Sequence, residues 1–123
     1  MKDGSENVDP RLVARIRDQQ AKDGINLSRM SVGAMVTFET LSGSVYVICK
    51  LDSQNEWSIQ GGKRWQEPTT VHIAGSTFGG SIIQPDWIGD SMHVEIWEGK
   101  PGDWKSVVTS AVVSIWEHAP ENT

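Results

Sequence analysis

From residue 34 to residue 118 the chain consists of short runs in which apolar and polar residues alternate, separated by turn-forming residues. The clearest run is SMHVEIW, where Met92, Val94 and Ile96 share one face and the intervening residues share the other. A strand that packs on a core through one face alternates in this way. No helical pattern lies between the runs, so neighbouring strands should connect by short turns and pair antiparallel. The sequence therefore predicts a mainly β domain, a small antiparallel barrel or sandwich.

Seven runs carry the predicted strands and indicate a core. In GSVYVICKL we expect Cys49 to be buried with Val45 and Val47, because the three share a face. The last run is either one long strand or two strands separated by a bulge near Ser110–Ala111. Three other runs each place a pair of residues on one face: Val36 with Phe38, Trp57 with Ile59, and Val71 with Ile73. The runs are AMVTFET, GSVYVICKL, EWSIQ, TTVHIA, GSIIQ, SMHVEIW and WKSVVTSAVVSIWEH.

The segment before the β domain has a different character. Asp9 followed by Pro10 is typical of a helix N-cap with proline in the first turn, and Gly24 is typical of a helix stop. We expect an amphipathic α-helix over 9–24, whose narrow apolar stripe must pack on its own domain or on a second copy of the chain. The other predicted units are a disordered N-terminus over 1–8, the β domain over 33–118 and a flexible C-terminus over 119–123.

Charge is unevenly distributed along the chain, whose formal net charge is −5. Residues 65–123 hold only Lys100 and Lys105 among the 11 basic residues, but eight of the 16 acidic ones. An acidic half repels a phosphate backbone, so we expect no nucleic-acid partner. The imbalance is compatible with self-association through complementary faces or with a basic partner, and its simplest effect is solubility.

Cysteine content and hydropathy bear on the compartment. Cys49 is the only cysteine, which excludes an intrachain disulfide framework and a multi-cysteine zinc site. The first residues, MKDGSEN, contain no apolar signal-peptide core, and no run is long enough to span a bilayer. We therefore expect a soluble, cytoplasmic protein with no membrane partner.

Evidence for catalysis is thin, and no catalytic residue is predicted. The stretch Gly75–Gly79 matches neither a nucleophile elbow nor a phosphate-binding loop. His93 and Glu95 share a face of one strand, and His72 could complete a transition-metal site with them if the strands are neighbours. Polar residues are, however, the ordinary content of the outer face of an antiparallel sheet. We therefore expect no cofactor, and a metal-dependent enzyme is the least favoured function.

The six tryptophans are the best clue to function. Trp65, Trp87 and Trp104 lie in predicted loops or turns, and Trp97 points away from the apolar face of its strand. Exposed tryptophans are enriched at interfaces, and the same rings can stack on sugars. The alternative is that these rings cap the open ends of a small barrel and belong to its core.

Two glycine-containing stretches complete the candidates. GGKRW presents Lys63 and Arg64 beside Trp65 and could hold an anionic ligand or an acidic patch, or be a solvated hairpin tip. AGSTFGGSIIQPDWIG, residues 74–89, is expected to be a tight corner between two strands, in which Gly75 ends the first strand. The candidate ligand-binding or interface residues are Lys63, Arg64, Trp65, Phe78, Trp87, Trp97 and Trp104.

The sequence resembles a group of small uncharacterised bacterial β-domain proteins. The resemblance rests on Gly75-Ser76 with Gly79-Gly80-Ser81, on Ile88-Gly89-Asp90-Ser91-Met92, and on the closing stretch TSAVVSI over 109–115. It covers roughly residues 33–117 and leaves the predicted helix outside. It implies a compact bacterial β domain, and no activity or site residue comes with it.

Three functions are therefore expected, in decreasing order. The first is a non-catalytic interaction module that forms a homo-oligomer through exposed tryptophans and complementary charge. The second is a small-ligand-binding barrel for a sugar or an anionic metabolite, with a site at one rim made by the Gly75–Gly80 loop and Trp65, Trp87 or Trp104. The third is a metal-dependent enzyme that uses His72, His93 and Glu95.

Overall fold

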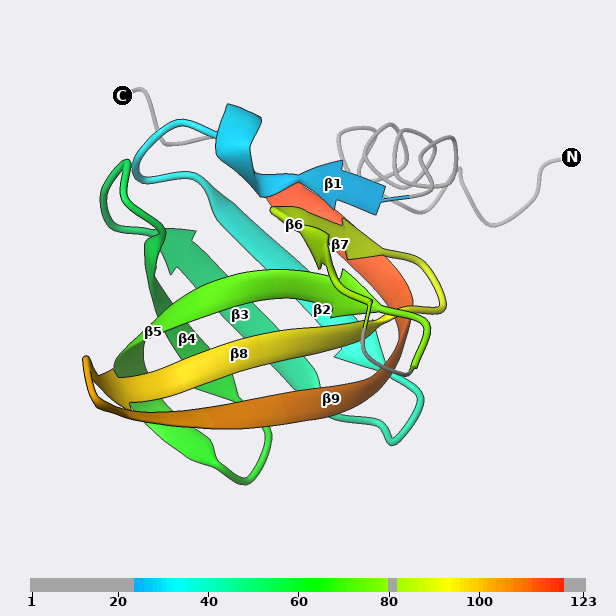
Figure 1. Cartoon of the computed structure of the whole chain (residues 1–123). Helices are drawn as coiled ribbons and strands as arrows, with labels where there is room; N and C mark the ends of the chain where they lie inside the picture. The colour runs from blue at the N-terminus through cyan, green and yellow to red at the C-terminus, as the bar shows by residue number, and fades with distance from the viewer. Residues whose placement is uncertain (1–23, 80–81, 119–123) are drawn as a thin grey trace, which may run out of the picture.

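The structure is a computed structural model that describes residues 24–79 and 82–118 (Figure 1). Within these ranges the regular structure is β-strand, apart from one turn of 3-10 helix, so the predicted mainly β class is confirmed. The elements are β1 (Gly24–Asn26), η2 (Leu27–Arg29), β2 (Met35–Thr40), β3 (Val45–Lys50), β4 (Glu56–Gly61), β5 (Trp65–Thr77), β6 (Gln84–Pro85), β7 (Trp87–Gly89), β8 (His93–Lys100) and β9 (Asp103–His118).

Six of the strands form a closed antiparallel barrel, which is one of the two architectures that the sequence predicts. Their order is β4-β3-β2-β9-β8-β5, and β5 pairs back with β4 to close the sheet. Figure 1 shows β5, β8 and β9 crossing the front of the barrel, with β2, β3 and β4 behind them. The short strand β6 extends β5, while β1 and β7 form a separate two-stranded sheet at the upper end. Closure removes free edges from the barrel strands, which protects a β protein from edge-to-edge association.

The barrel interior is filled by the apolar faces that the alternation predicts. Met92, Val94 and Ile96 are buried on β8 and in the turn before it, in agreement with the pattern SMHVEIW. The inward pairs expected on β2, β4 and β5 are also confirmed. These pairs are Val36 and Phe38, Trp57 and Ile59, and Val71 and Ile73, all nearly inaccessible to solvent.

The prediction of which face of β3 is buried is wrong. Ile48 and Lys50 are buried and Tyr46 packs on the core, whereas Val45 is exposed and Cys49 is only half-buried on the outer face. Both faces of this strand are apolar, so alternation alone does not distinguish them. The pairing with β2 decides: Ile48 lies opposite Val36 and Tyr46 opposite Phe38, and residues directly opposite in a sheet share a face.

β9 is one long strand, and its inward face is displaced by bulges. Between the pairs His93–Ala111 and Glu95–Val108, β9 has one residue more than β8, close to the predicted bulge. It has another extra residue opposite the Glu39–Thr40 step of β2. An extra residue moves the following side chains to the other face. The residues that face inward are consequently spaced unevenly, at Val107, Thr109, Val112 and Ile115.

Several predicted boundaries need correction. The helix expected over 9–24 lies outside the described residues except for Gly24, which begins β1 and pairs with Gly89. β1 and β7 were not expected as strands, because each has only three residues and no alternation. β5 has 13 residues and continues through Gly75 to Thr77, so Gly75 does not end it. Of the predicted strand GSIIQ, the first two residues lie outside the described ranges and Ile82 and Ile83 are not in a strand. β6 begins at Gln84 and goes on to Pro85, as an edge position permits.

Segments from outside the barrel close one of its ends. Leu27, Met30 and Ile88 are buried against the core there. The η2 turn is started by Asn26, whose side-chain oxygen accepts from the backbone N–H of Ser28 at 3.0 Å. Lys50, at the end of β3, reaches this turn from inside the barrel and donates to the carbonyls of Leu27 and Met30.

Gly75 is required by the close approach of β6 to β5. Its φ is +140°, and a Cβ at this position would lie 2.0 Å from the carbonyl oxygen of Gln84. A side chain here would face both an unfavourable backbone conformation and a backbone clash. Gly102, in the turn between β8 and β9, also has a positive φ, of +87°, but a Cβ there meets no atom within 4 Å.

We expect Gly75→Ala to destabilise the protein more than Gly102→Ala. Backbone strain costs each variant about 1–3 kcal/mol. Of the two, only Gly75→Ala also places a Cβ against a backbone atom. Chemical denaturation of both variants measures the difference in free energy of unfolding. Equal losses for the two variants would contradict the close packing of β6 on β5.

Candidate functional site

Three aromatic side chains from adjacent strands gather on the outer face of the barrel. His72 lies on β5, Trp97 on β8 and Trp104 on β9, the three strands that cross the front in Figure 1. His72 is directly opposite Trp97 in the β5–β8 pair, and Gly99 is directly opposite Trp104 in the β8–β9 pair. We call these three residues the aromatic cluster.

The rings of the aromatic cluster are in contact. The His72 and Trp104 ring centroids are 4.9 Å apart with an interplanar angle of 85°, an edge-to-face arrangement. The Trp97 and Trp104 centroids are 6.3 Å apart at 46°. His72 and Trp104 lie on strands that flank β8, and Gly99 of β8 has no side chain to stand between them. A Cβ at Gly99 would lie 2.4 Å from the carbonyl oxygen of Asp103, so the glycine permits the close approach of the β9 backbone just before Trp104.

A hollow of about 310 Å³ lies against the aromatic cluster, and we call it the aromatic pocket. Besides the three rings, its wall contains Ala74 and Asn55. Asn55 has a φ of +69°, which asparagine tolerates better than most residues. Its side chain donates to the carbonyl of Ile73 at 2.9 Å and accepts from Trp57 Nε1 at 3.0 Å. These two bonds hold the turn between β3 and β4 against β5.

Polar groups border this largely apolar pocket. Glu95 lies two residues before Trp97 on the same face of β8, and its Oε2 accepts from Trp97 Nε1 at 2.6 Å. This bond fixes the indole and leaves the second carboxylate oxygen with acceptor capacity. His72 Nδ1 is buried and has no hydrogen-bond partner among the described residues. The arrangement offers flat apolar surfaces for stacking together with a few polar groups for orientation, and it lacks an activated nucleophile with a positioned base.

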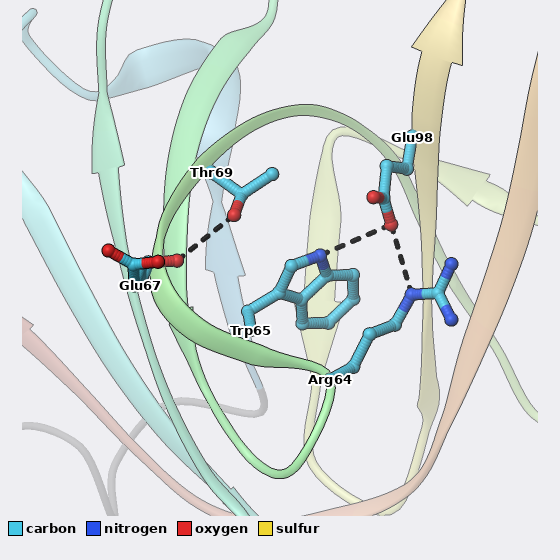
Figure 2. Close-up of polar contacts among 5 residues, drawn as sticks. All are labelled: Arg64, Trp65, Glu67, Thr69 and Glu98. Carbon is cyan, nitrogen blue, oxygen red and sulfur yellow. Dashed lines mark hydrogen bonds and ion pairs between the residues drawn. The ribbon is translucent and has the colours of Figure 1, made fainter.

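The structure places the GGKRW residues differently from the expectation. Trp65 is not an exposed loop ring: it begins β5, is 2% exposed, and packs edge-to-face on Tyr46. Figure 2 shows Glu98 of β8 accepting from both Trp65 Nε1, at 3.2 Å, and Arg64 Nε, at 3.0 Å. The Trp65 ring therefore belongs to the core, which was the alternative stated for the tryptophans. Lys63 and Arg64 are exposed, and Arg64 is engaged by Glu98.

The other predicted interface residues are not brought together with the aromatic cluster. Trp87 is half-buried on β7, and its ring lies against Gly24 and Gly89. Phe78, which follows β5, is 74% exposed. Of the seven candidates, only Trp97 and Trp104 meet in one site. Sequence reasoning missed Asn55 and Ala74, although an asparagine in the turn sequence DSQNE is a usual carrier of positive φ.

The proposed metal residues are also separated. His72 is opposite Trp97 in the β5–β8 pair, whereas His93 is opposite Thr77, five residues further along β5. His93 Nδ1 is 2.9 Å from the carbonyl oxygen of Thr109. Within residues 24–79 and 82–118, no three His, Cys, Asp or Glu side chains are grouped closely enough to hold a metal ion. His72 and Glu95 instead flank the aromatic pocket.

Comparisons with known proteins identify no family for this chain. Searches against protein-family models, curated proteins and solved structures find no match. In the part of the chain that the structure describes, no helix is long and apolar enough to cross a membrane. The resemblance to small bacterial β-domain proteins stays an expectation from the sequence.

We expect Glu98→Ala to destabilise the protein more than Arg64→Ala. Loss of Glu98 leaves the Trp65 indole N–H without its acceptor, which costs about 1–3 kcal/mol for a buried donor. Loss of Arg64 removes a solvated ion pair, worth about 0–1 kcal/mol. It also removes the cation at 5.7 Å from the Trp65 ring centroid, worth about 0.5–1 kcal/mol at an exposed site. Thermal and chemical unfolding measure both effects. Glu67→Ala is the matched control, since the bond from Thr69 in Figure 2 goes to the Glu67 main-chain carbonyl. A loss in Glu67→Ala as large as that in Glu98→Ala would contradict the assigned role.

Proposed function

We propose that the protein is a non-catalytic binding module whose aromatic pocket takes a neutral sugar. The observation that carries the proposal is the meeting of Trp97, Trp104 and His72, from three adjacent strands, around one hollow. Glu95 lies outside its wall and accepts from the indole N–H of Trp97. The three aromatic residues are separated in the sequence, and their rings lie on the outside of the barrel, where an antiparallel sheet ordinarily carries polar side chains.

The chemistry of the pocket suits a pyranose ring. Such a ring has an apolar face of C–H groups, which can stack on an indole, and a border of hydroxyls that both donate and accept hydrogen bonds. Trp97 and Trp104 supply the flat surfaces, and Glu95 supplies acceptor oxygens. Trp97 is 38% exposed, so a ligand can reach it without displacing another part of the described chain.

Charge favours a neutral ligand over the anionic metabolite that was also considered. The wall contains no lysine or arginine, and Lys63 and Arg64, the residues expected to attract an anion, are not part of it. Glu95 is not in the wall either, but its carboxylate is bonded to the wall residue Trp97. An anion placed beside Glu95 would be repelled at short range. The proposed site lies on the outer face of the barrel and differs from the expected rim site: Trp65 is buried in the core and Trp87 lies on β7, and of the three tryptophans expected there only Trp104 lines the pocket.

The proposal predicts binding of neutral saccharides that depends on the two exposed rings. Glucose, galactose, N-acetylglucosamine and cellobiose, titrated with detection by calorimetry and tryptophan fluorescence, should identify at least one ligand, with glucuronate binding more weakly. Trp97→Ala or Trp104→Ala should lower the affinity about fivefold or more, since each stacked ring contributes on the order of 1 kcal/mol or more.

Trp116→Ala is the matched control, because Trp116 lies on β9 like Trp104 but is outside the pocket wall. It should leave sugar affinity unchanged. Absence of any response to the four neutral sugars at millimolar concentration, or equal losses in all three variants, would overturn the proposal.

Self-association is a second proposed function, and a different surface supports it. An apolar strip follows the outer face of β3 and includes the start of β2: Met35, Val45 and Leu51 are exposed, and Val47 and Cys49 are half-buried beside them. Thr37 and Glu39 of β2, directly opposite Val47 and Val45, are its polar neighbours. Exposed patches of this kind commonly mark interaction sites. The face lies at the back of the barrel in Figure 1, away from the aromatic pocket, so a second copy could cover it without blocking the pocket.

Self-association predicts that Val45→Lys weakens a homodimer. A lysine at this position lies directly opposite Glu39, and burying the charged pair in an interface costs desolvation that its attraction does not repay. Val108→Lys is the matched control: Val108 is 53% exposed and Val45 is 45% exposed, but Val108 lies on β9 opposite Glu95. Light scattering after size exclusion should show a dimer for the wild type and for Val108→Lys, and a monomer for Val45→Lys. A wild-type monomer at tens of micromolar would contradict this function.

A further inference from the structure

A second hollow, of about 260 Å³, lies where the η2 turn crosses the end of the barrel. Its wall is formed by η2, the end of β3, the turn between β3 and β4, the start of β4, and the residue between β6 and β7. It is separate from the aromatic pocket, although Asn55 contributes to both walls. The lining residues are Leu27, Ser28, Lys50, Ser53, Gln54, Asn55, Trp57 and Asp86.

The unusual member of this wall is Lys50, a cation that is only 8% exposed. Its Nζ donates to the carbonyl oxygens of Leu27 at 3.0 Å and Met30 at 2.9 Å. An ammonium group has three N–H donors, so one is left over. Within the described residues the only ion pair is Arg64–Glu98, and no carboxylate pairs with Lys50. Burying a charge without a counter-ion costs free energy. The remaining N–H donor of Lys50 is therefore a favourable site for an anionic oxygen, which would form a charge-assisted hydrogen bond.

The rest of the wall is polar and lies around an aromatic surface. Nζ of Lys50 is 5.9 Å from the centroid of the Trp57 ring. The Asn55 amide uses one of its two N–H groups on Ile73, which leaves one for a ligand. Ser53 and Gln54 add a hydroxyl and an amide from exposed turn positions. Asp86 places one carboxylate in the same wall, which disfavours a multiply charged anion and favours a ligand with a cationic group.

We propose that this pocket binds a small monocarboxylate, with a carboxylate oxygen accepting from Lys50 Nζ, and that zwitterionic amino acids are its preferred ligands because their ammonium group can face Asp86. The cavity volume limits the ligand to a small molecule. Two fixed carbonyl bonds orient the Lys50 ammonium group before a ligand arrives, which lowers the entropy cost of binding. This site does not depend on the sugar site, since its charge and its residues, apart from Asn55, are different.

The test uses the full chain and follows the Trp57 indole N–H signal by ¹H–¹⁵N NMR, with acetate, glycine and phosphate as separate probes. Acetate and glycine should shift this signal in a saturable way, glycine at lower concentration than acetate, and phosphate should not shift it. No saturable shift with acetate or glycine, or a phosphate response equal to theirs, would overturn the proposal.

Two variants locate the binding. Lys50→Met keeps an unbranched side chain and should abolish the acetate and glycine shifts, but it also removes the bonds to Leu27 and Met30 and could lower stability. Ser53→Phe, at an exposed position, should block the pocket without altering Lys50, and Ser106→Phe, exposed on β9, is its matched control. Binding that persists unchanged in Ser53→Phe would place the ligand elsewhere and contradict the proposal.

Discussion

The pairing of β4 with β5 is the constraint on which the rest of the structure depends. It turns a six-stranded sheet into a closed barrel, so every inward side chain has to fill a fixed interior and both open ends have to be covered. Trp65 covers one end with Tyr46 and Glu98, and the η2 turn with Lys50 covers the other. Because the interior is full, binding sites have to lie on the outer face or between the barrel and the segments that cover its end. Both candidate sites lie in such places.

The strand pattern could be predicted from the sequence wherever only one face of a strand is apolar. On β8 the alternation identified the inward face without any knowledge of the neighbours. On β3 it failed, because Val45 and Val47 are as apolar as Tyr46 and Ile48, and the choice between the faces depends on register with β2. Register is a non-local property, and no local pattern in GSVYVICKL contains it. The same apolar outer face is the basis for proposing self-association.

The candidate sites were predictable only in part, for a related reason. Trp97 was identified as facing outward because it alternates with buried residues of its own strand. Its contact with Trp104 depends on the register that places Trp104 opposite Gly99, and the contact of Trp104 with His72 depends on β5 and β9 flanking β8. Trp65 was misplaced because its burial depends on Glu98, 33 residues away. Lys50 was not singled out at all, since lysine is rarely buried and its partners are main-chain carbonyls that carry no residue identity.

The two pockets share Asn55, and its geometry determines whether they communicate. Its side chain is held at both ends, by the Ile73 carbonyl on β5 and by Trp57 Nε1 on β4, and its backbone is fixed in the left-handed region. A residue restrained in this way has no second arrangement of comparable energy to adopt, and coupling between sites requires such a two-state element. A ligand in one pocket should therefore contact Asn55 without moving it. If both proposed ligands bind, we expect Asn55 to act as a rigid wall between the two pockets, so that binding in one does not change the affinity of the other.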